Sequence, residues 1–501
     1  MTSRAFQSKQ PKRAIMRSCK TIAFIALAGL LNACSIQQAN IKPAEAPASW
    51  VDAQSIEVVS DPNIVLQRWW ESFEDPTLNQ LIAQASTNNY DIKVATQRLV
   101  QSRAMRDYNK GALLPQITAS PQINRQQTGY NWTEAMGLFN TLSVGFDATW
   151  EADIFGGLRL TVQASENEML SSLESRRDTM VSLLAEVATN YATVRGAQVR
   201  AAIAKENISV NKETLRLTKV QFDRGLISDI NLAKSQAQYE AAQANLQPLL
   251  ATIDSSTNSL ALLLGTYPAE IKPLLEKQAP ALNTPRRLPL MLPSEVMRNR
   301  PDIRQAERKL AASLDRVGIA HTNYYPSFQI PLSVGYETTP FGLIFNPASL
   351  IWSFGLNVSQ SIFQGGRLDA QLSNAEANAE ASRLTYEKSF RSAVSEVETA
   401  LSGFKTQRNQ VVSLTGRVND FGVTVNRSQE LYKRGLKDYL SVLSSQNDLY
   451  TAQNALEQSR LSEVNYLISL YKALGGGWQL LEPSDNYASA GTTNLPETNK
   501  P

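Results

Sequence analysis

Residues 141–157 read TLSVGFDATWEADIFGG, and side chains of two kinds alternate along this stretch until two glycines close it. The apolar positions are Leu142, Val144, Phe146, Ala148 and Trp150, with polar residues or glycine between them. Successive side chains of a strand point to opposite faces, so the pattern predicts a strand with one apolar and one largely polar face. Gly156 and Gly157 match no phosphate-binding loop, and we expect them to form a hinge where the strand turns into a helix.

A single long helix is predicted to follow these glycines. Residues 158–222 contain no proline and one glycine, and the helix formers Ala, Leu, Glu and Gln recur throughout. At a rise of 1.5 Å per residue this segment would span roughly 100 Å. No globular core is that wide, so the helix is expected to form part of a rod or tube.

The same motifs return in the same order later in the chain. The spacing is 211 from Asp91 to Asp302 and from Pro115 to Pro326, 209 from Gly156 to Gly365, and 210 from Arg224-Gly225-Leu226 to Arg434-Gly435-Leu436. Four landmarks at nearly one spacing indicate two copies of one unit, each predicted to run helix, strand, strand, long helix, tight turn, helix. Gly365 and Gly366 then form the second hinge, before a long helix over residues 368–432.

Two shorter helices accompany each long one. In the first copy they are predicted over 81–113 and 229–264, so that end to end they match the long helix and four helical strings form per chain. The last helix carries a seam with steps of three and four residues, at Leu440, Leu443, Asn447, Tyr450, Asn454, Glu457, Leu461, Val464, Ile468 and Tyr471. A second stripe contains Leu449, Ala452, Leu456 and Leu470. Two contact faces suit a barrel wall with neighbours on both sides.

The strands point to a membrane. Segments 328–336 and 352–358 alternate as 141–151 does, whereas Pro121 interrupts the weaker segment 116–126. Strands of this length with one apolar face are typical of outer membrane barrels, although any single strand of a soluble sheet can alternate in the same way. Four strands per chain would leave unpaired edges in lipid, at several kcal/mol per backbone group. Three copies would close a twelve-stranded barrel, continued by twelve helical strings.

The N-terminal segment predicts export and a lipid anchor. Residues 1–33 place six Lys and Arg and no acid before an apolar run from Ile22 to Leu31, too short to span a bilayer, and Met16 is an alternative start. Leu31-Asn32-Ala33-Cys34 looks like a bacterial lipobox, in which Cys34 becomes the acylated first residue. Ser35 stands where inner membrane lipoproteins carry Asp, which favours the outer membrane.

Charge and chemistry exclude several classes of protein. Without residues 1–33 the chain has 43 Lys and Arg against 46 Asp and Glu, so nucleic acid binding loses its support. Cys34 becomes the sole cysteine, and the sole histidine, His321, lies beside a predicted turn in no metal-ligand pattern. No nucleophile, base and orienting group form a set. We expect no enzyme activity, no metal and no cofactor.

The turns at Gly225 and Gly435 join the long helices to their return helices. A hairpin of this length would place both turns roughly 100 Å from the strands, at a periplasmic tip. For the two glycines a role in the turn suffices. Their neighbours Arg224, Leu226, Arg434 and Leu436 are candidates for docking a partner protein, with a pure turn role as the alternative.

The chain resembles the TolC-like outer membrane efflux family, in its lipoprotein branch that serves RND pumps. The motifs are Trp69-Trp70 with Phe73 and Asp75-Pro76, Arg300-Pro301-Asp302-Ile303, Phe363-Gln364-Gly365-Gly366-Arg367-Leu368, and the closing residues 471–478, YKALGGGW. The resemblance implies a membrane α+β fold, a homotrimer with a transmembrane β-barrel and a periplasmic coiled-coil α-barrel, an adaptor protein and an inner membrane RND transporter. Many members close the pore with two acids, and Asn426 and Gln429 stand at the matching places here.

These observations predict five segments and a passive function. After the signal peptide come an anchored and equatorial segment over 34–80, the two repeats over 81–285 and 286–482, and a disordered tail over 483–501. The leading hypothesis is an exit duct for small toxic compounds in a tripartite efflux pump. The alternatives are an exit channel for protein secretion with an ABC transporter, and a structural periplasmic coiled coil or envelope enzyme.

Overall fold

The computed structural model describes residues 47–51, 62–127, 138–277 and 280–479. The predicted signal peptide, Cys34 and the tail lie outside these residues. The described chain divides into two compact units. One contains Val100–Leu170 and Glu307–Thr385, and the other contains 47–99, Ser171–Ala306 and 386–479. No helix of the described residues combines the length and apolar composition that crossing a bilayer requires.

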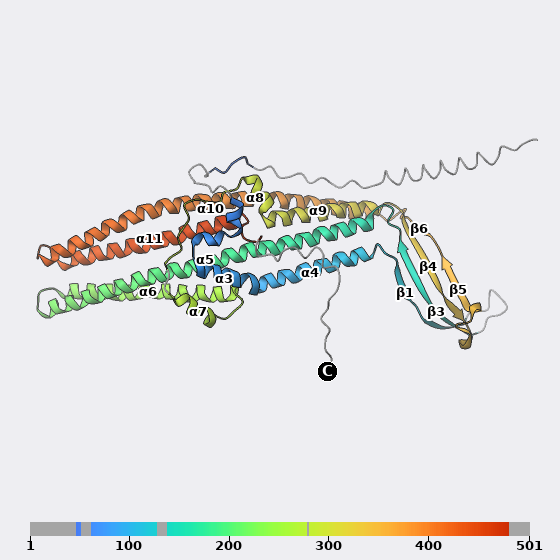
Figure 1. Ribbon diagram of the computed structural model, residues 1–501, viewed down its shortest axis with the longest axis horizontal. Coiled ribbons are helices and arrows are strands. Elements are labelled where there is room, and N and C mark those ends of the chain that lie inside the picture. The colour runs from blue at the N-terminus through green and yellow to red at the C-terminus, as the bar shows by residue number, and fades with distance from the viewer. Residues whose placement is uncertain (1–46, 52–61, 128–137, 278–279, 480–501) are drawn as a thin grey trace, which may run out of the picture. The chain divides into compact units, whose positions relative to one another are not determined.

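The first unit contains one antiparallel sheet (Figure 1). Its strands are β1 Gln116–Ala119, β2 Gln122–Gln127, β3 Leu138–Glu151, β4 Ser327–Thr338, β5 Leu350–Phe354 and β6 Asn357–Ser359. The order is β1-β3-β4-β5, with β2 also on β3 and β6 also on β4. The six strands thus occupy four positions, and the four predicted strand segments are confirmed, two of them in broken form.

Prolines explain both breaks. Pro121 separates β1 from β2, because it has no N–H to donate to the ladder. Between β5 and β6, the Gly355 N–H donates to the Pro331 carbonyl of β4 at 3.0 Å. Paired residues of an antiparallel ladder exchange two hydrogen bonds, and Pro331 cannot return the second one. The central pair β3 and β4 has no break and matches Leu142 to Glu151 with Thr338 to Gln329.

Two helices of 67 residues contribute to both units. They are α5 Gly157–Asp223 and α10 Arg367–Lys433, which confirms the long helices predicted over 158–222 and 368–432. The helices that return from the turns, α6 Asp229–Leu263 and α11 Tyr439–Ala473, also lie where the sequence pattern indicates. The remaining elements are α2 Pro62–Gln67, η2 Trp69–Phe73, α3 Pro76–Asn88, α4 Tyr90–Gly111, α7 Pro268–Glu276, α8 Pro293–Asn299, α9 Pro301–Thr322, η3 Phe341–Leu343 and η4 Pro347–Ser349.

The single helix predicted over 81–113 is wrong, because Asn89 divides it into α3 and α4. The Asn89 Oδ1 atom accepts hydrogen bonds from the N–H groups of Asp91 and Ile92 at 2.8 and 3.1 Å, so its side chain caps α4. Its Nδ2 atom donates to the Leu263 carbonyl at the end of α6 at 2.9 Å. In the second repeat Arg300 occupies the same place between α8 and α9, and its guanidinium donates to the Ala473 carbonyl at the end of α11 at 2.8 Å. The side chain that ends one helix thus also joins it to the returning helix.

Helix α11 packs through two faces, as its two stripes predict. On one face Ala452 and Leu456 are buried, and Ser459 donates to the Gln407 Oε1 atom of α10 at 3.0 Å. On the other face, Leu461 lies over Gly196 of α5, where a Cβ would come within 3.3 Å of the leucine side chain. The long helices therefore share α11 as a common neighbour within the second unit.

An aromatic cluster forms the core of the second unit. Trp69 of η2 stacks on Tyr471 of α11 with ring centroids 5.0 Å apart, and Trp70 and Phe73 meet Trp69 edge to face. The Tyr471 hydroxyl lies 3.0 Å from the Ser72 Oγ atom. Aromatic pairs of these geometries stabilise beyond the area that they bury. The segment before the first repeat is thus fixed to the last helix of the chain.

Burial raises the pKa of Tyr471 to about 12. The folded state therefore holds its phenol proton between pH 10 and 12 whereas the unfolded chain loses it, so stability falls as the pH rises through this range. We expect Tyr471→Phe to cost about 1 kcal/mol at neutral pH, for the lost hydrogen bond, and its deficit relative to wild type to shrink above pH 10. Thermal unfolding followed by circular dichroism at pH 7 to 12 measures both. A deficit that stays constant with pH would contradict this role.

Candidate functional sites in the sheet and at the helical turns

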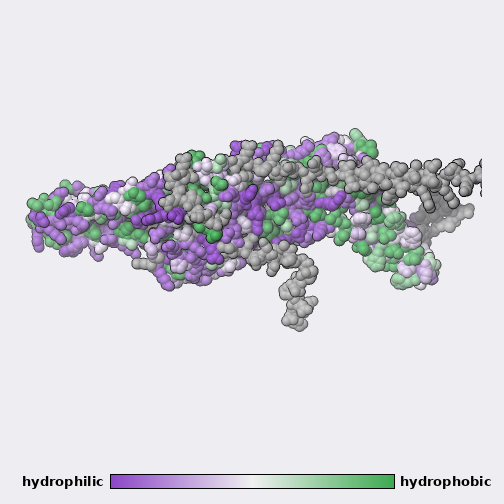
Figure 2. Space-filling view, turned by 45° about the horizontal axis from the view of Figure 1, so that its top comes forward, coloured by the Kyte–Doolittle hydropathy of each residue, from purple (hydrophilic) through white to green (hydrophobic). Residues whose placement is uncertain are grey.

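One face of the sheet is apolar across all four strand positions. Phe146 of β3 lies opposite Val334 of β4, which lies opposite Trp352 of β5, so the three side chains share this face. The next register row, Ala148, Leu332 and Phe354, lies on the same face. Trp352 is 73% exposed, and Figure 2 shows apolar surface over the strands. An apolar surface this continuous is unfavourable in water and fits lipid.

The opposite face of the sheet is polar. Asp147 accepts a hydrogen bond from Ser120 at 2.7 Å, and the hydroxyls of Ser333 and Ser353 lie 2.8 Å apart. Gly145 and Gly335 face one another on this side, where a Cβ on Gly145 would come within 2.7 Å of the Val334 carbonyl oxygen. One face of the sheet therefore suits an apolar environment and the other suits water.

The two outer strand positions present free edges. Among the described residues, β1 and β2 pair only with β3, and β5 and β6 pair only with β4. Four antiparallel positions alternate in direction, so the strands at the two edges run in opposite directions. The outer N–H and C=O groups of each edge need partners wherever water is absent.

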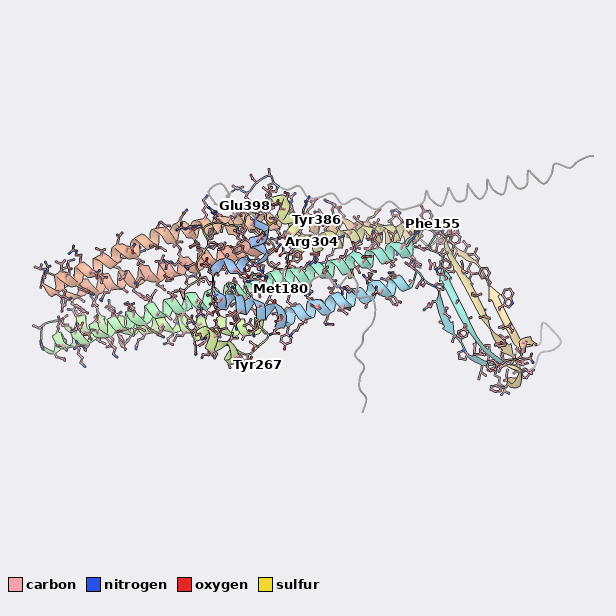
Figure 3. All side chains as sticks on the ribbon, in the orientation of Figure 1. Phe155, Met180, Tyr267, Arg304, Tyr386 and Glu398 are labelled. Carbon is pink, nitrogen blue, oxygen red and sulfur yellow. The ribbon has the colours of Figure 1, made fainter. Side chains whose placement is uncertain are left out.

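The predicted hinge glycines lie where each strand gives way to a long helix (Phe155 marks the first junction in Figure 3). Gly156, Gly365 and Gly366 have φ of 84°, 59° and 81°, which L side chains rarely adopt. Gly157 has no positive φ, but a Cβ there would come 2.8 Å from the Thr322 hydroxyl oxygen. Before the first hinge, the Asp153 carboxylate accepts hydrogen bonds from the N–H groups of Leu158 and Arg159 and so caps α5.

Both helical turns close in the same way. The N–H of Gly225 donates to the Phe222 carbonyl and that of Leu226 to the Gln221 carbonyl, at 2.8 and 2.9 Å. The turn at Gly435 repeats both bonds one repeat later, and both glycines have φ of 71°. This is the Schellman ending of a helix, which favours glycine at the left-handed position. The proposed docking residues Arg224, Leu226, Arg434 and Leu436 are all exposed.

The predicted gate positions carry no charge. Asn426 is exposed and Gln429 is half-buried on α10. Their acidic neighbour Glu430 forms an ion pair with Arg427 at 2.9 Å. Between Asn426 and Gln429, the buried Ser428 hydroxyl lies 3.0 Å from the hydroxyl of Ser445 of α11. Packing and neutral hydrogen bonds therefore hold this part of α10.

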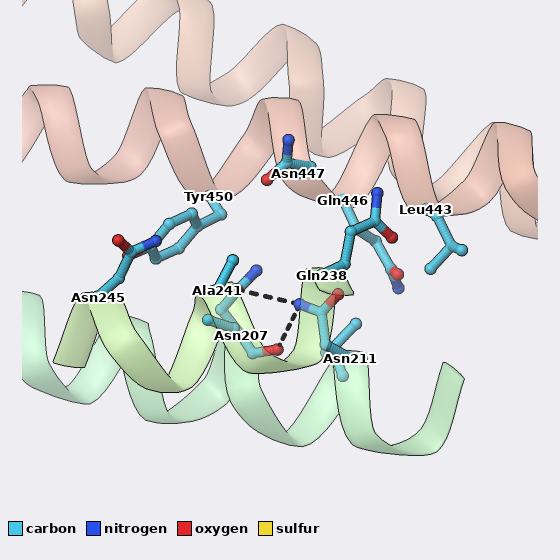
Figure 4. A pocket seen from close by; sticks show the side chains of 11 residues that line it. Asn207, Asn211, Gln238, Ala241, Asn245, Leu443, Gln446, Asn447 and Tyr450 are labelled. Atoms are coloured by element: carbon cyan, nitrogen blue, oxygen red, sulfur yellow. Dashed lines mark hydrogen bonds between the residues drawn. The ribbon is translucent and has the colours of Figure 1, made fainter. Parts of the chain in front are cut away.

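A polar cavity of about 170 Å³ lies between α5, α6 and α11 in the second unit (Figure 4). Its lining includes six amide side chains, those of Asn207, Asn211, Gln238, Asn245, Gln446 and Asn447. The volume and the polarity suit several water molecules. Sequence reasoning missed this feature, because the amides come from three helices that only the fold brings together. His321 lies in the last turn of α9, and the described residues contain no group of three His, Cys, Asp or Glu that could hold a metal ion.

An exposed two-faced sheet and 67-residue helices are features of an outer membrane channel, and comparisons identify the family. The family model described as "Outer membrane efflux protein" matches residues 81–266 and 292–476. The probable efflux pump outer membrane protein TtgC of Pseudomonas putida is 30% identical over 90% of this chain and 94% of its own length. The cation efflux system protein CusC of Escherichia coli is 28% identical over 93% and 100%. The chain belongs to the outer membrane efflux protein family.

Solved structures agree with this assignment. The outer membrane channel OprN superposes with a TM-score of 0.84 and 30% identity, over 89% of this chain and 100% of that one. The open MtrE channel of Neisseria gonorrhoeae gives 0.80 and 26%, over 89% and 98%. The fold is thus that of the TolC-like channels, and the protein is an outer membrane component of efflux.

The two faces of the sheet predict opposite responses to a lysine. Val334→Lys places a charge on the apolar face, where lipid contact costs about 2–4 kcal/mol, and we expect less protein in the outer membrane fraction. Ser333→Lys, its neighbour on the polar face, loses only the hydroxyl contact with Ser353, at about 1 kcal/mol. Quantifying both variants in isolated outer membranes tests this assignment. Equal insertion of both variants would contradict it.

Gly435→Val is expected to impair drug resistance without preventing membrane insertion. No described atom lies within 4 Å of a Cβ added at Gly435, so the cost arises from its positive φ. That cost is about 1–2 kcal/mol for an ordinary L residue and larger for a β-branched one. Gly435→Asn is the matched control, because Asn tolerates this conformation. Minimum inhibitory concentrations of a deletion strain carrying each variant give the comparison, and equal loss for both would rule out a backbone cause.

Proposed function

We propose that three copies of this chain close their sheets into a twelve-stranded transmembrane barrel. The two edges of one sheet are different strands, so the contact between copies is head to tail and closes a ring. Because the edge strands run in opposite directions, each new pair is antiparallel like those within the chain. Two copies would form eight strands, and side chains fill the interior of such a barrel. Three copies leave room for a water-filled pore lined by the polar face.

In this proposal the chain is anchored as well as inserted. Residues 1–33 are removed on export and Cys34 carries the acyl chains in the outer membrane. Residues 34–80 form the anchored equatorial segment, and the stacking of Trp69 on Tyr471 supports its attachment to the helices. The repeats over 81–285 and 286–482 each supply two strand positions and two helical strings.

The turns at Gly225 and Gly435 form the docking surface for a periplasmic adaptor protein, which links the channel to an inner membrane RND transporter. Their exposure and the shared backbone geometry support this role. Asn426 and Gln429 stand where many members of the family carry the acids that ring the closed pore, so helix packing closes the pore at these gate positions. Opening is then a shift between packed arrangements that partner binding favours.

The protein acts as a passive exit duct for small toxic compounds and catalyses no reaction. Related proteins are named for toluene, for antibiotics and for cations. Such different cargo on one fold supports a duct that does not select what passes, with selection by the transporter. The observation that carries this function is the sheet that is apolar on one face, polar on the other and open at both edges.

Conductance and susceptibility test this function together. Purified protein added to a planar lipid bilayer is expected to give ion-conducting steps, and deletion of the gene is expected to sensitise the cell to members of a panel of antibiotics, dyes, solvents and metals. A soluble monomer without conductance would contradict the channel. Unchanged susceptibility together with loss of a secreted protein would favour protein export instead.

A further inference from the structure

The junction between the first repeat and the second contains an aromatic contact. Phe155, which follows β3, stacks on Tyr325, which precedes β4, with ring centroids 4.7 Å apart. Phe155 also lies 6.3 Å from the Phe328 ring. The Ala152 N–H donates to the Phe328 carbonyl at 2.8 Å, so the sheet and the aromatic contact join at one place. All of these residues belong to the first unit.

The same residues have counterparts in the other repeat that are largely exposed within the described part of the chain. The Ile154-Phe155 motif recurs 208 positions later as Ile362-Phe363, and Pro326 has its counterpart 211 positions earlier at Pro115. Phe155 therefore corresponds to Phe363, while Tyr325 and Phe328 correspond to Leu114 and Ile117. The three counterparts are apolar, and they are 91%, 67% and 67% exposed. They lie at the two outer edges of the sheet.

We infer that Phe363 of one copy seats against Leu114 and Ile117 of the next copy, as Phe155 seats against Tyr325 and Phe328 within the chain. The inference rests on the proposed ring of copies and specifies the contact that closes it. A repeat that cannot bury its apolar surface alone is expected to bury it against the next repeat. Within one chain, the first repeat packs against the second repeat. At the outer edge of the second repeat, the corresponding neighbour is the first repeat of another copy.

The helices beside this junction are compatible with the contact. Within the chain, Asn167 of α5 donates to Asp315 of α9 at 2.8 Å, and Glu168 pairs with Arg316. The counterparts on α10 are Ala377 and Asn378, and those on α4 are Ala104 and Met105, all of them exposed. Because the two alanines are small and Met105 and Asn378 carry no charge, α4 of one copy and α10 of another can meet here without burying an unpaired charge.

The correspondence also predicts the strand register between copies. Glu151 lies opposite Gln329 within the chain, and their counterparts are Ser359 and Thr118. Ser359 of one copy is then expected opposite Thr118 of the next, which places Phe354 opposite Ile123. In this register Phe354 and Val358 meet the apolar Ile123 and Ala119 on one face, and Ser353 meets Asn124 on the other. Further along the pair, Trp352 comes opposite Arg125. A shift of one residue would reverse every pairing.

A disulfide between copies tests the register directly. Opposite residues of an antiparallel pair have Cα atoms about 4.5–5.5 Å apart, within the range that a disulfide spans. We expect Ser359→Cys with Thr118→Cys to give covalent dimers and trimers on non-reducing gels after mild oxidation. Glu151→Cys with Gln329→Cys is the intrachain control and is expected to stay at the mass of one chain. Cys34, acylated in the proposed function, offers no competing thiol.

The negative control is Ser359→Cys with Ala119→Cys, whose side chains point to opposite faces in this register. Three results would each overturn the inference while leaving the channel intact. The first is cross-linking of the negative control, and the second is an intrachain bond from Ser359→Cys with Thr118→Cys. The third is no bond from that pair in a protein that still migrates as a trimer in mild detergent. A monomer in detergent would overturn the proposed function as well.

As a second measurement, Phe363→Ala is expected to lower the temperature at which trimers dissociate by several degrees. Phe363→Leu is expected to restore most of that lost thermal stability.

Discussion

The hydrogen bonds of the backbone at the edges of one sheet govern the architecture of this protein. The sheet has four antiparallel positions, one apolar face and one polar face, and the described part of the chain covers neither edge. In water such edges could bind solvent, but the apolar face is stable only in lipid, where unpaired N–H and C=O groups cost several kcal/mol each. In the proposed function, other copies supply the missing strands and so make the two requirements compatible. The sheet proposed to insert into the membrane is then also the surface through which the copies assemble.

The internal repeat meets this requirement by using one structural unit twice in each chain. Each repeat supplies one outer and one central strand position, and the contact between repeats at Phe155 and Tyr325 shows how neighbouring repeats fit. The long helices continue the pattern, because α11 contacts both α10 and α5 through separate faces. A polar cavity between α5, α6 and α11 interrupts this packing. A layer of amides packs less tightly than an apolar seam, which supports the proposed shift between packed arrangements of these helices.

Sequence periodicity was sufficient for the regular elements and insufficient where a side chain competes with the backbone. Alternation predicted β3 and β4, and the absence of proline predicted α5 and α10. The break at Asn89 was missed because a capping side chain leaves no mark on the periodicity of the residues around it. The short helices α7 and α8 were not predicted either, since α7 contains Pro273 and α8 has only two turns. The glycines at the turns and the unpaired edges of a four-stranded sheet were predictable from the sequence, whereas the amide cavity depends on how three helices pack together.

Hydrogen exchange at the strand edges measures the central constraint most directly. In protein extracted from the outer membrane with mild detergent, water reaches the polar face, so unpaired peptide N–H groups of β1 and β5 would exchange within seconds. Peptides from β1, β5 and β6 are expected to be protected to the same order as the central pair β3 and β4, because strands of neighbouring copies cover them. Rapid exchange at both outer positions, with the central pair still protected, would show an open sheet and contradict it.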